Sequence, residues 1–315
     1  MKIVFMGTPD FAVSSLERLI AEGHEVVGVF TQPDKPRGRK HLLTPPPVKE
    51  CALKHGIPVY QPESLKNGEA MPILSELQPD LIVVAAFGML LKSDVLHFPK
   101  YGCINVHASL LPKYRGAAPI NKCILEGETE TGVTTMLMDE GLDTGDMLLS
   151  ETVSIGENET AGELFDRLAV LGGNVLQKTL EALEAGTLTR TPQDDSQSTY
   201  AGMLSKEDSP VDWSRSAQKV HDQVRGLSPW PSAFTEREGQ SLKIHRTQLA
   251  PEVTDELTGL AGAGALYAEK GRLFVRCGDG HYVELLEVQP QGSRKMDAKS
   301  YLLGHPAGAG SFVNS

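Results

Sequence analysis

Short apolar runs alternate with helical patterns in the first half of the chain. The apolar runs cover residues 2–6, 25–30, 81–86 and 103–106. Residues 11–20 repeat apolar side chains at helical spacing, which predicts an amphipathic helix directly after the first run. Strands that are apolar throughout and alternate with helices are typical of a parallel sheet covered on both faces. We therefore expect a doubly wound, mostly parallel α/β sheet.

Two further strands and a long helix follow, and then the composition changes. Residues 132–138 and 147–153 read as strands joined by an acid-rich loop, and residues 161–185 carry leucine and valine at helical spacing. Between residues 186 and 210 Thr, Gln, Asp and Ser replace the large apolar residues, which is typical of a domain boundary. We expect a first domain over 1–189, a linker over 190–209 and a second domain over 210–315.

The second domain has a different pattern. One helix is expected over residues 216–226, and short β-rich segments follow it at 242–246, 264–269, 273–276 and 282–288. Several short strands separated by turn signals indicate a small β-barrel or a β-sandwich. Trp213 and Trp230 are interpreted as core or domain-interface residues.

Composition excludes several classes of protein. The chain has 315 residues, 40% of them hydrophobic and 23% charged, so it is neither disordered nor collagen-like. Its four cysteines are scattered and include no Cys-x-x-Cys, which argues against a disulfide framework and against a zinc site. No apolar run approaches the roughly 20 residues that a bilayer span needs. We expect a soluble, cytoplasmic, monomeric protein that uses no metal and binds no membrane.

The charge is unevenly distributed. Thirty Lys+Arg against 41 Asp+Glu give a net charge of −11, which by itself argues against a polyanionic partner. From residue 205 onward there are 13 basic and 14 acidic residues, so residues 1–204 hold the remaining 17 and 27, a net of −10. One basic island lies within that acidic half, a Pro- and Gly-rich loop that indicates contact with a polyanion. Its charged residues are Asp34, Lys35, Arg37, Arg39, Lys40 and Lys49.

An amide and an imidazole follow the apolar run at 103–106. Asn105 and His107 are two residues apart, so in extended chain they project to the same side. Open α/β sheets bind ligands at the carboxyl ends of their strands. Together the two side chains could polarise a carbonyl group and transfer a proton. The plainer interpretation is that both satisfy local backbone groups at a strand end.

The acid-rich loop supplies a carboxylate for this pair. It contains Asp139, Asp143 and Asp146, and a carboxylate beside an imidazole stabilises its protonated form and orients it. Short acidic side chains also make turns, and we expect that role for two of the three. Gly7 follows the first apolar run, yet Gly-x-Gly-x-x-Gly is absent, so the evidence for a bound dinucleotide is weak.

These motifs together resemble the folate-dependent formyltransferase family. Asn-x-His is followed by Ser-Leu-Leu-Pro-x-Tyr-Arg-Gly, and Asp-x-Gly-x-Asp-Thr-Gly begins at Asp139. The opening Gly-Thr-Pro-Asp-Phe, the basic loop, Asp-Trp-Ser-Arg-Ser from Asp212 and Arg-Gly-Leu-Ser-Pro-Trp-Pro from Arg225 are similar to the members that act on aminoacyl-tRNA. The resemblance extends from about residue 1 to about residue 310. It implies a Rossmann-related first domain and a second domain resembling an OB-fold barrel.

The resemblance also implies a reaction. The donor would be 10-formyltetrahydrofolate, and the acceptor would be the α-amine of methionine on initiator tRNA. Asn105 and His107 would stabilise the tetrahedral oxyanion, while Asp143 would orient His107 and assist proton transfer. Two segments would contact the folate, and they comprise Phe87, Gly88, Met89, Leu91, Ser109, Leu110, Leu111 and Pro112. The basic loop would contact tRNA through Lys35, Arg37, Arg39 and Lys40.

Three alternatives stay open at this point. One is a formyltransferase that acts on a small amine such as a ribonucleotide or a sugar nucleotide, against which the second domain and the basic loop count. Another is a folate hydrolase that uses water as the acceptor. The third is a non-catalytic tRNA-binding protein, against which the intact Asn105, His107 and Asp143 count.

Overall fold

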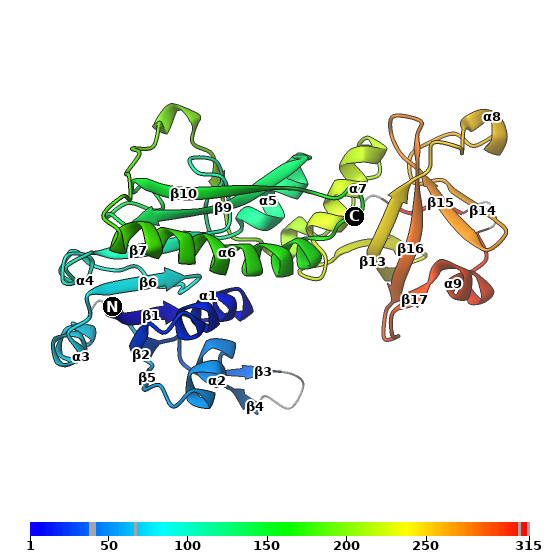
Figure 1. Ribbon diagram of the computed structural model, residues 1–315. Helices are drawn as coiled ribbons and strands as arrows, with labels where there is room; N and C mark the ends of the chain where they lie inside the picture. Colours follow the sequence, from blue (N-terminus) through cyan, green and yellow to red (C-terminus); the bar gives the residue numbers. More distant parts are fainter. Residues whose placement is uncertain (38–41, 66–67, 308–309, 314–315) are drawn as a thin grey trace. The chain divides into compact units, whose positions relative to one another are not determined.

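The computed structural model describes residues 1–37, 42–65, 68–307 and 310–313. These residues divide into two units (Figure 1). The first comprises Met1–Pro119, Thr131–Val153 and Phe165–Ala201, and the second comprises Ile120–Glu130, Ser154–Leu164 and Gly202–Ser315. The expected linker over 190–209 thus contains the last residues of the first unit, and its boundaries stay a prediction.

A seven-stranded sheet forms the centre of the first unit, in the order β10-β9-β7-β6-β1-β2-β5. The strands are β1 (Lys2–Gly7), β2 (Glu25–Phe30), β5 (Val59–Tyr60), β6 (Leu81–Ala85), β7 (Cys103–His107), β9 (Glu130–Leu137) and β10 (Met147–Ser154). The strands from β7 to β5 are parallel, and β9 runs antiparallel to β7. The expected mostly parallel sheet is confirmed.

Helices cover both faces of this sheet because its central strands are apolar on both sides; β6 and β7 are buried at every residue. The helices of the first unit, whose labels lie around the sheet in Figure 1, are α1 (Asp10–Ala21), α2 (Pro47–Lys54), α3 (Ala70–Leu77), α4 (Ser93–Leu96) and, from Phe165 onward, α6 (Ala161–Glu184). Helix α5 (Pro119–Glu126) belongs, apart from its first residue, to the second unit. Phe11 of α1 packs edge-on against Phe165 of α6, with ring centroids 5.7 Å apart. On the opposite face, Val4 and Met6 of β1 share a core cluster with Leu74 of α3.

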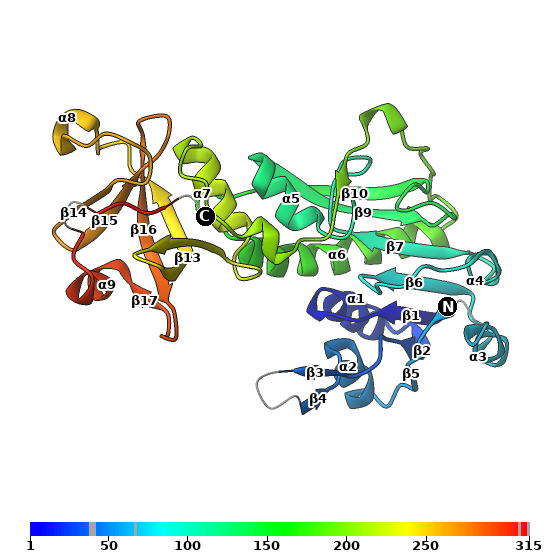
Figure 2. The ribbon, with the colours of Figure 1, turned by 180° about the vertical axis from the view of Figure 1, so that it is seen from behind.

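Three small elements complete the first unit. The hairpin of β3 (Lys35–Arg37) and β4 (Leu42–Thr44) lies at the foot of Figures 1 and 2. A short parallel pair joins β8 (Arg115–Gly116) to β11 (Tyr200–Ala201). The turn η2 (Asp195–Gln197) precedes β11. None of these elements has an apolar periodicity that would have revealed it in the sequence.

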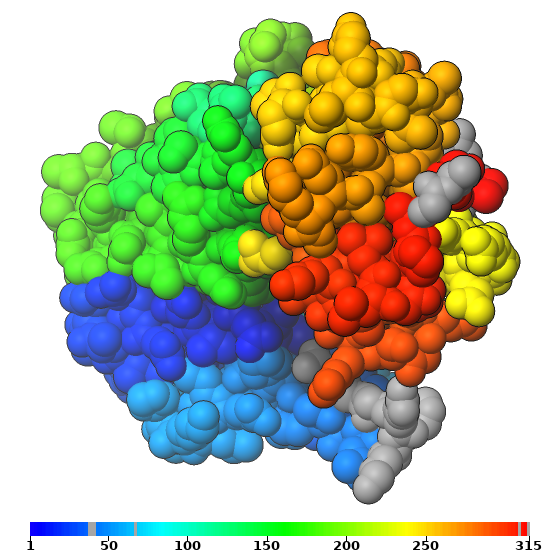
Figure 3. Space-filling view, turned by 90° about the vertical axis from the view of Figure 1, so that its right-hand side faces the viewer, coloured from blue at the N-terminus to red at the C-terminus, as the bar shows by residue number. Residues whose placement is uncertain are grey.

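An antiparallel sheet forms the second unit, and its order is β12-β13-β16-β15-β14, with β17 paired to β16. The strands are β12 (Ala233–Arg237), β13 (Gln240–Leu249), β14 (Leu266–Glu269), β15 (Arg272–Arg276), β16 (Tyr282–Pro290) and β17 (Met296–Asp297). The turn η3 (Lys206–Asp208) precedes them, as does α7 (Ala217–Gly226), whereas α8 (Asp255–Thr258) and α9 (Ala298–Gly304) follow β13 and β17. Figure 3 shows the surface of this unit, where α9 in red lies beside the strands in orange. The expected second domain of short β-strands is confirmed, and its sheet is antiparallel.

The end of the chain joins the two edges of this sheet. Val313 bridges to Glu236 of the edge strand β12, and Ser311 bridges to Ala265, next to the other edge strand, β14. Pairing of this kind covers part of each edge of the sheet. Phe312, which lies between the two bridges, stacks on Trp213 with ring centroids 5.6 Å apart.

The two tryptophans differ. Trp213 is fully buried and donates from Nε1 to Thr235 Oγ1 over 3.0 Å, as expected of a core residue. Trp230 is 56% exposed, so of the two expected roles the core is excluded, and a place at a domain interface stays a prediction. Among the described residues, no helix has the length and hydropathy that crossing a bilayer requires.

Candidate active site

Polar side chains gather at the carboxyl ends of the parallel strands. The strand order reverses between β1 and β6, and the neighbouring strand β7 carries Asn105 and His107 at its end. Their side chains share one side of β7 because they are two residues apart. Asn105 is 8% exposed and His107 is 6% exposed, so the protein surrounds both groups. This is the position at which open α/β sheets bind their ligands.

A backbone carbonyl determines which nitrogen of His107 carries a proton. The Nε2 atom lies 2.9 Å from the carbonyl oxygen of Tyr114, and a carbonyl can only accept, so Nε2 donates. The lone pair of the neutral ring is therefore on Nδ1. Nδ1 lies 3.6 Å from Asp143 Oδ2, so a proton taken up there would face a carboxylate.

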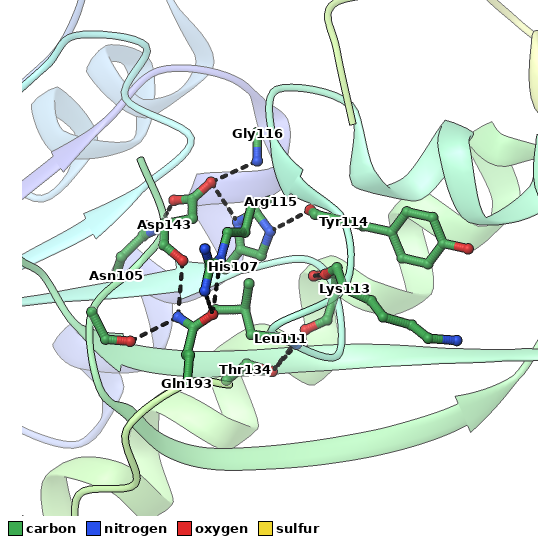
Figure 4. A network of polar contacts seen from close by, with 12 residues as sticks. Asn105, His107, Leu111, Lys113, Tyr114, Arg115, Gly116, Thr134, Asp143 and Gln193 are labelled. Carbon is green, nitrogen blue, oxygen red and sulfur yellow. Dashed lines mark hydrogen bonds and ion pairs between the residues drawn. The ribbon is translucent and has the colours of Figure 1, made fainter. Parts of the chain in front are cut away.

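Asp143 is held by groups on two other segments. Its Oδ2 accepts from the backbone N–H of Gly116 over 2.8 Å, and its Oδ1 lies 3.4 Å from Asn105 Nδ2. The backbone of Asp143 is left-handed, with φ of +54°, a conformation that Asp adopts more readily than most residues. Figure 4 shows the three predicted residues brought together from strand β7 and from the β9–β10 loop.

Asp139, which lies in the same loop, makes a turn. Asp139 Oδ1 accepts from the Gly141 N–H over 3.0 Å and from Thr144 Oγ1 over 2.6 Å. A Cβ on Gly145 would overlap the carbonyl oxygen of Leu137, so the loop can close only on a glycine. The turn-making role expected for such aspartates is thus observed at Asp139, and it leaves Asp143 free to face the imidazole.

An amide, an imidazole and a carboxylate in mutual contact can perform acid–base chemistry. The Nδ1 lone pair can accept a proton, Asp143 can stabilise the resulting positive charge, and the Asn105 amide can donate to a developing negative charge. Among the described residues, no group of three or more His, Cys, Asp or Glu side chains is placed to hold a metal ion.

Four groups that sequence reasoning missed complete this network. They are the carbonyl of Tyr114, the N–H of Gly116, the guanidinium of Arg115 and the side-chain amide of Gln193. The first three lie within the Pro-x-Tyr-Arg-Gly motif, so their position after His107 could have indicated them. Gln193 lies 50 residues from Asp143 in a polar stretch, and no local signal marks it.

The first predicted folate-contacting segment is largely a packed loop. Phe87 and Leu91 are buried in the core cluster of the sheet, with Met89 partly buried against it, so packing explains the first two side chains. Thr8 Oγ1 and Gln32 Nε2 both donate to the Phe87 carbonyl, over 3.0 and 3.1 Å, and fasten this loop to the ends of β1 and β2. Gly88 is exposed, with φ of +77°. An open hollow of about 450 Å³ adjoins the loop, lined by Leu91, Lys92, Ser93, Asp94 and Glu140.

The second predicted segment is held by hydrogen bonds within the protein, and two of its apolar side chains are partly accessible. Ser109 is fully buried, and its Oγ donates to the Lys113 carbonyl over 2.7 Å, so this hydroxyl shapes the loop. The Leu111 N–H donates to Thr134 Oγ1 over 3.2 Å. Leu110 and Pro112 are half-buried and remain available for a ligand. The structure does not test the folate contacts, which stay a prediction.

The basic loop is anchored at its base. Lys49 Nζ contacts both oxygens of Asp34 at 2.9 Å, and Gln61 Nε2 donates to the same carboxylate over 2.8 Å. The hydrogen bond from Gln61, and then that from Lys49, hold the pKa of Asp34 below its ordinary value. Lys35 is exposed and donates to Gln32 Oε1 over 2.7 Å. Arg39, Lys40 and the side chain of Arg37 lie outside the described residues.

Comparison with known proteins agrees with the motifs. Residues 1–180 match the family described as formyl transferase, and residues 203–306 match the formyl transferase C-terminal domain. The methionyl-tRNA formyltransferase of Geobacter metallireducens is 49% identical over 304 residues, which is 96% of both chains. That of Trichlorobacter lovleyi is 50% identical over 313 residues, 99% of this chain and 96% of the relative.

A solved structure has the same fold at lower identity. The N-formyltransferase from Helicobacter canadensis, in complex with folinic acid and dTDP-3-aminofucose, superimposes with a TM-score of 0.70. It is 20% identical, and the match covers 90% of this chain and 98% of that one. With both family regions matched in order and half of all positions shared with full-length relatives, the chain belongs to the formyltransferase family.

Proposed function

We propose that this enzyme transfers the formyl group of 10-formyltetrahydrofolate to the α-amine of methionine on initiator tRNA. The observation that carries the proposal is the 49–50% identity to methionyl-tRNA formyltransferases over at least 96% of the chain. That identity extends through both family regions, so it includes the C-terminal region, which an isolated catalytic domain would lack. The product would be N-formylmethionyl-tRNA, used to initiate translation.

The geometry supports a different role for each side chain in the chemical step. The free amine attacks the formyl carbon and forms a tetrahedral intermediate whose oxygen is negatively charged. Asn105 Nδ2 has two hydrogens and donates one to Asp143 Oδ1 over 3.4 Å, so the other can bind that oxygen. The intermediate collapses as the bond from the formyl carbon to the folate nitrogen breaks.

The proton lost by the amine must reach the folate nitrogen that leaves. His107 Nδ1 carries the lone pair of the neutral ring, so this atom takes the proton from the amine and returns it to the leaving nitrogen. Asp143 Oδ2, 3.6 Å away, stabilises the imidazolium that exists between these two transfers. The Gly116 N–H donates to the same oxygen and holds the carboxylate in place.

The two substrates would be bound by different surfaces. Leu110, Pro112 and the hollow beside Leu91 offer apolar and polar surface for the folate. The basic loop, with Lys35, Arg37, Arg39 and Lys40, would contact phosphates of the tRNA, which position the acceptor end without reading its bases. The second unit would supply a further tRNA surface.

A direct assay tests the proposal against the small-amine alternative. The protein is incubated with 10-formyltetrahydrofolate and methionyl-initiator tRNA, methionyl-elongator tRNA or a dTDP-amino sugar, and each product is identified by mass spectrometry. Uncharged initiator tRNA is the control, since it lacks the amine. We expect formylation of methionyl-initiator tRNA; formylation of the amino sugar alone would refute the proposal.

A lysine pair tests the basic loop. Lys35→Ala is expected to raise the KM for charged tRNA severalfold and leave the KM for folate unchanged, because one phosphate contact is lost. The salt slope of tRNA binding should fall by about one. Lys54→Ala removes an exposed lysine from the nearby helix α2 and is the matched control. Equal changes in the KM for charged tRNA in the two variants would contradict a role of the loop in binding tRNA.

A further inference from the structure

The chain beyond helix α6 returns to the active site. We define the return segment as residues 191–201. Thr191 pairs with Met147 at the start of β10, and β11 at its other end pairs with β8. The whole segment belongs to the first unit. A stretch that reads as a polar linker is therefore bonded along its length to the residues that follow His107 and Asp143.

Gln193 is the residue of this segment that contacts the Asp143 loop. Its Nε2 donates to the Asp143 carbonyl over 2.9 Å and to the Gly145 carbonyl over 2.7 Å. Its Oε1 accepts from Arg115 Nε over 3.0 Å and from Arg115 Nη2 over 2.8 Å. Arg115, which is 9% exposed, also pairs with Asp195 on the return segment at 2.8 Å. Figure 4 shows Gln193 between Arg115 and the Asp143 loop.

The return segment also supports His107. The Tyr114 N–H donates to Thr199 Oγ1 over 2.9 Å, and the Arg115 N–H donates to the Thr199 carbonyl over 2.9 Å. Tyr114 has a left-handed backbone, with φ of +60°, and its carbonyl accepts from His107 Nε2. The two non-glycine left-handed residues of the site, Tyr114 and Asp143, are thus both bonded to this one segment.

We propose that Gln193 is a positioning residue for formyl transfer. Its amide holds the carbonyls of Asp143 and Gly145, and this keeps the left-handed turn that directs the Asp143 carboxylate at His107 Nδ1. A left-handed backbone at a non-glycine residue is strained, so it persists only where surrounding bonds enforce it. Without the amide, both carbonyls turn to water and the turn relaxes. The inference rests on the proposed function for its chemistry, whereas its geometry is independent of the acceptor.

Two substitutions distinguish the bonds of Gln193 to the Asp143 loop from its bonds to Arg115. Gln193→Met has similar length but loses both the donors to the loop and the acceptor for Arg115. Gln193→Glu keeps the acceptor for Arg115, loses the donors, and adds a negative charge that faces the carbonyls of Asp143 and Gly145. We expect both variants to lower kcat at least tenfold with less than a threefold change in either KM. Gln197→Met and Gln197→Glu are matched controls, because Gln197 is exposed and its amide contacts only Ser196 Oγ, at 3.4 Å.

A double-mutant cycle tests whether Gln193 acts through Asp143. In the Asp143→Asn background, Gln193→Glu is expected to change kcat by less than twofold, because the carboxylate it positions is already gone. A purely structural role would lower kcat by the same factor in both backgrounds, and that outcome overturns the proposal. A single Gln193→Glu variant with kcat within twofold of wild type overturns it as well.

A measurement without substrate separates this proposal from the proposed function. In protein labelled with ¹⁵N-histidine, the His107 Nδ1 chemical shift is expected to change in Gln193→Met, which adds no charge, and to stay unchanged in Gln197→Met. An unchanged shift in Gln193→Met overturns the positioning role. If the wild-type enzyme formylates a different amine, the proposed function fails, and the same variants are then measured with that amine.

Discussion

Replacing Asp143 by Asn tests the centre of the site with the smallest change in shape. The Gly116 N–H donates to Oδ2, so the carbonyl oxygen of the new amide occupies that position and its NH₂ group takes the place of Oδ1. The side chain keeps its volume and its bond to Gly116. It loses the negative charge that faces His107 Nδ1 from 3.6 Å.

The size of the effect follows from that distance. At an effective dielectric constant of about 20, two unit charges 3.6 Å apart interact by roughly 5 kcal/mol. The charge of Asp143 acts on the step in which Nδ1 receives a proton, so the loss is expected in kcat and not in substrate binding. At about 1.4 kcal/mol per factor of ten, kcat is expected to fall by about three powers of ten.

The assay is single-turnover formylation of methionyl-tRNA at saturating 10-formyltetrahydrofolate, with product separated on acid gels. Asp139→Asn is the matched control, because an Asn oxygen can still accept from Gly141 and Thr144. It should keep kcat within about twofold. An Asp143→Asn enzyme that retains more than a tenth of wild-type kcat would refute the assignment of Asp143 as the group that stabilises the imidazolium.

The remaining predictions concern stability. Burial lowers the pKa of His221 below its ordinary value of 6.5, so the folded state keeps the ring neutral while the unfolded chain takes up a proton; Tm should fall as pH drops below 6.5, and less steeply in His221→Gln. Phe312→Ala removes the ring stacked on Trp213 and should cost about 3–5 kcal/mol in urea unfolding. Thr160→Ala removes the capping oxygen for Glu163 and should cost about 1 kcal/mol, measured in the same way.

Each of these has an outcome that contradicts it. Equal pH slopes of Tm for wild type and His221→Gln would mean that another group carries the dependence, such as the buried ring of His245, whose pKa is also lowered by burial. A loss below 1 kcal/mol for Phe312→Ala would mean that the tail does not close the sheet. Hydrogen bonds from Thr160 and Arg246 lower the pKa of Glu163 to about 2. An unchanged free energy of unfolding in Thr160→Ala would mean that the cap between Thr160 and Glu163 does not stabilise the helix.

Periodicity predicted the elements that bury a continuous apolar face. Strand β2 has the expected bounds, and helix α6 ends one residue earlier than expected, because long apolar stretches have one favourable way to be buried. Strand β12 was missed, since in its sequence, Ala-Phe-Thr-Glu-Arg, only two of five residues are apolar. Its partner β13 and the tail at Val313 define it as a strand.

For the site, the sequence by itself predicted which three side chains come together and the family to which the chain belongs. Asn105, His107 and Asp143 lie in motifs with fixed local spacing, and local spacing survives in any fold that keeps the strand and the loop. Only the tertiary structure decided which nitrogen of His107 carries the lone pair, because the carbonyl of Tyr114 makes that choice through space. It also brought Gln193 to the Asp143 loop across 50 residues of chain. Hydrogen bonds between distant segments leave no periodic trace in a sequence, since they require only that two groups meet once the core has packed.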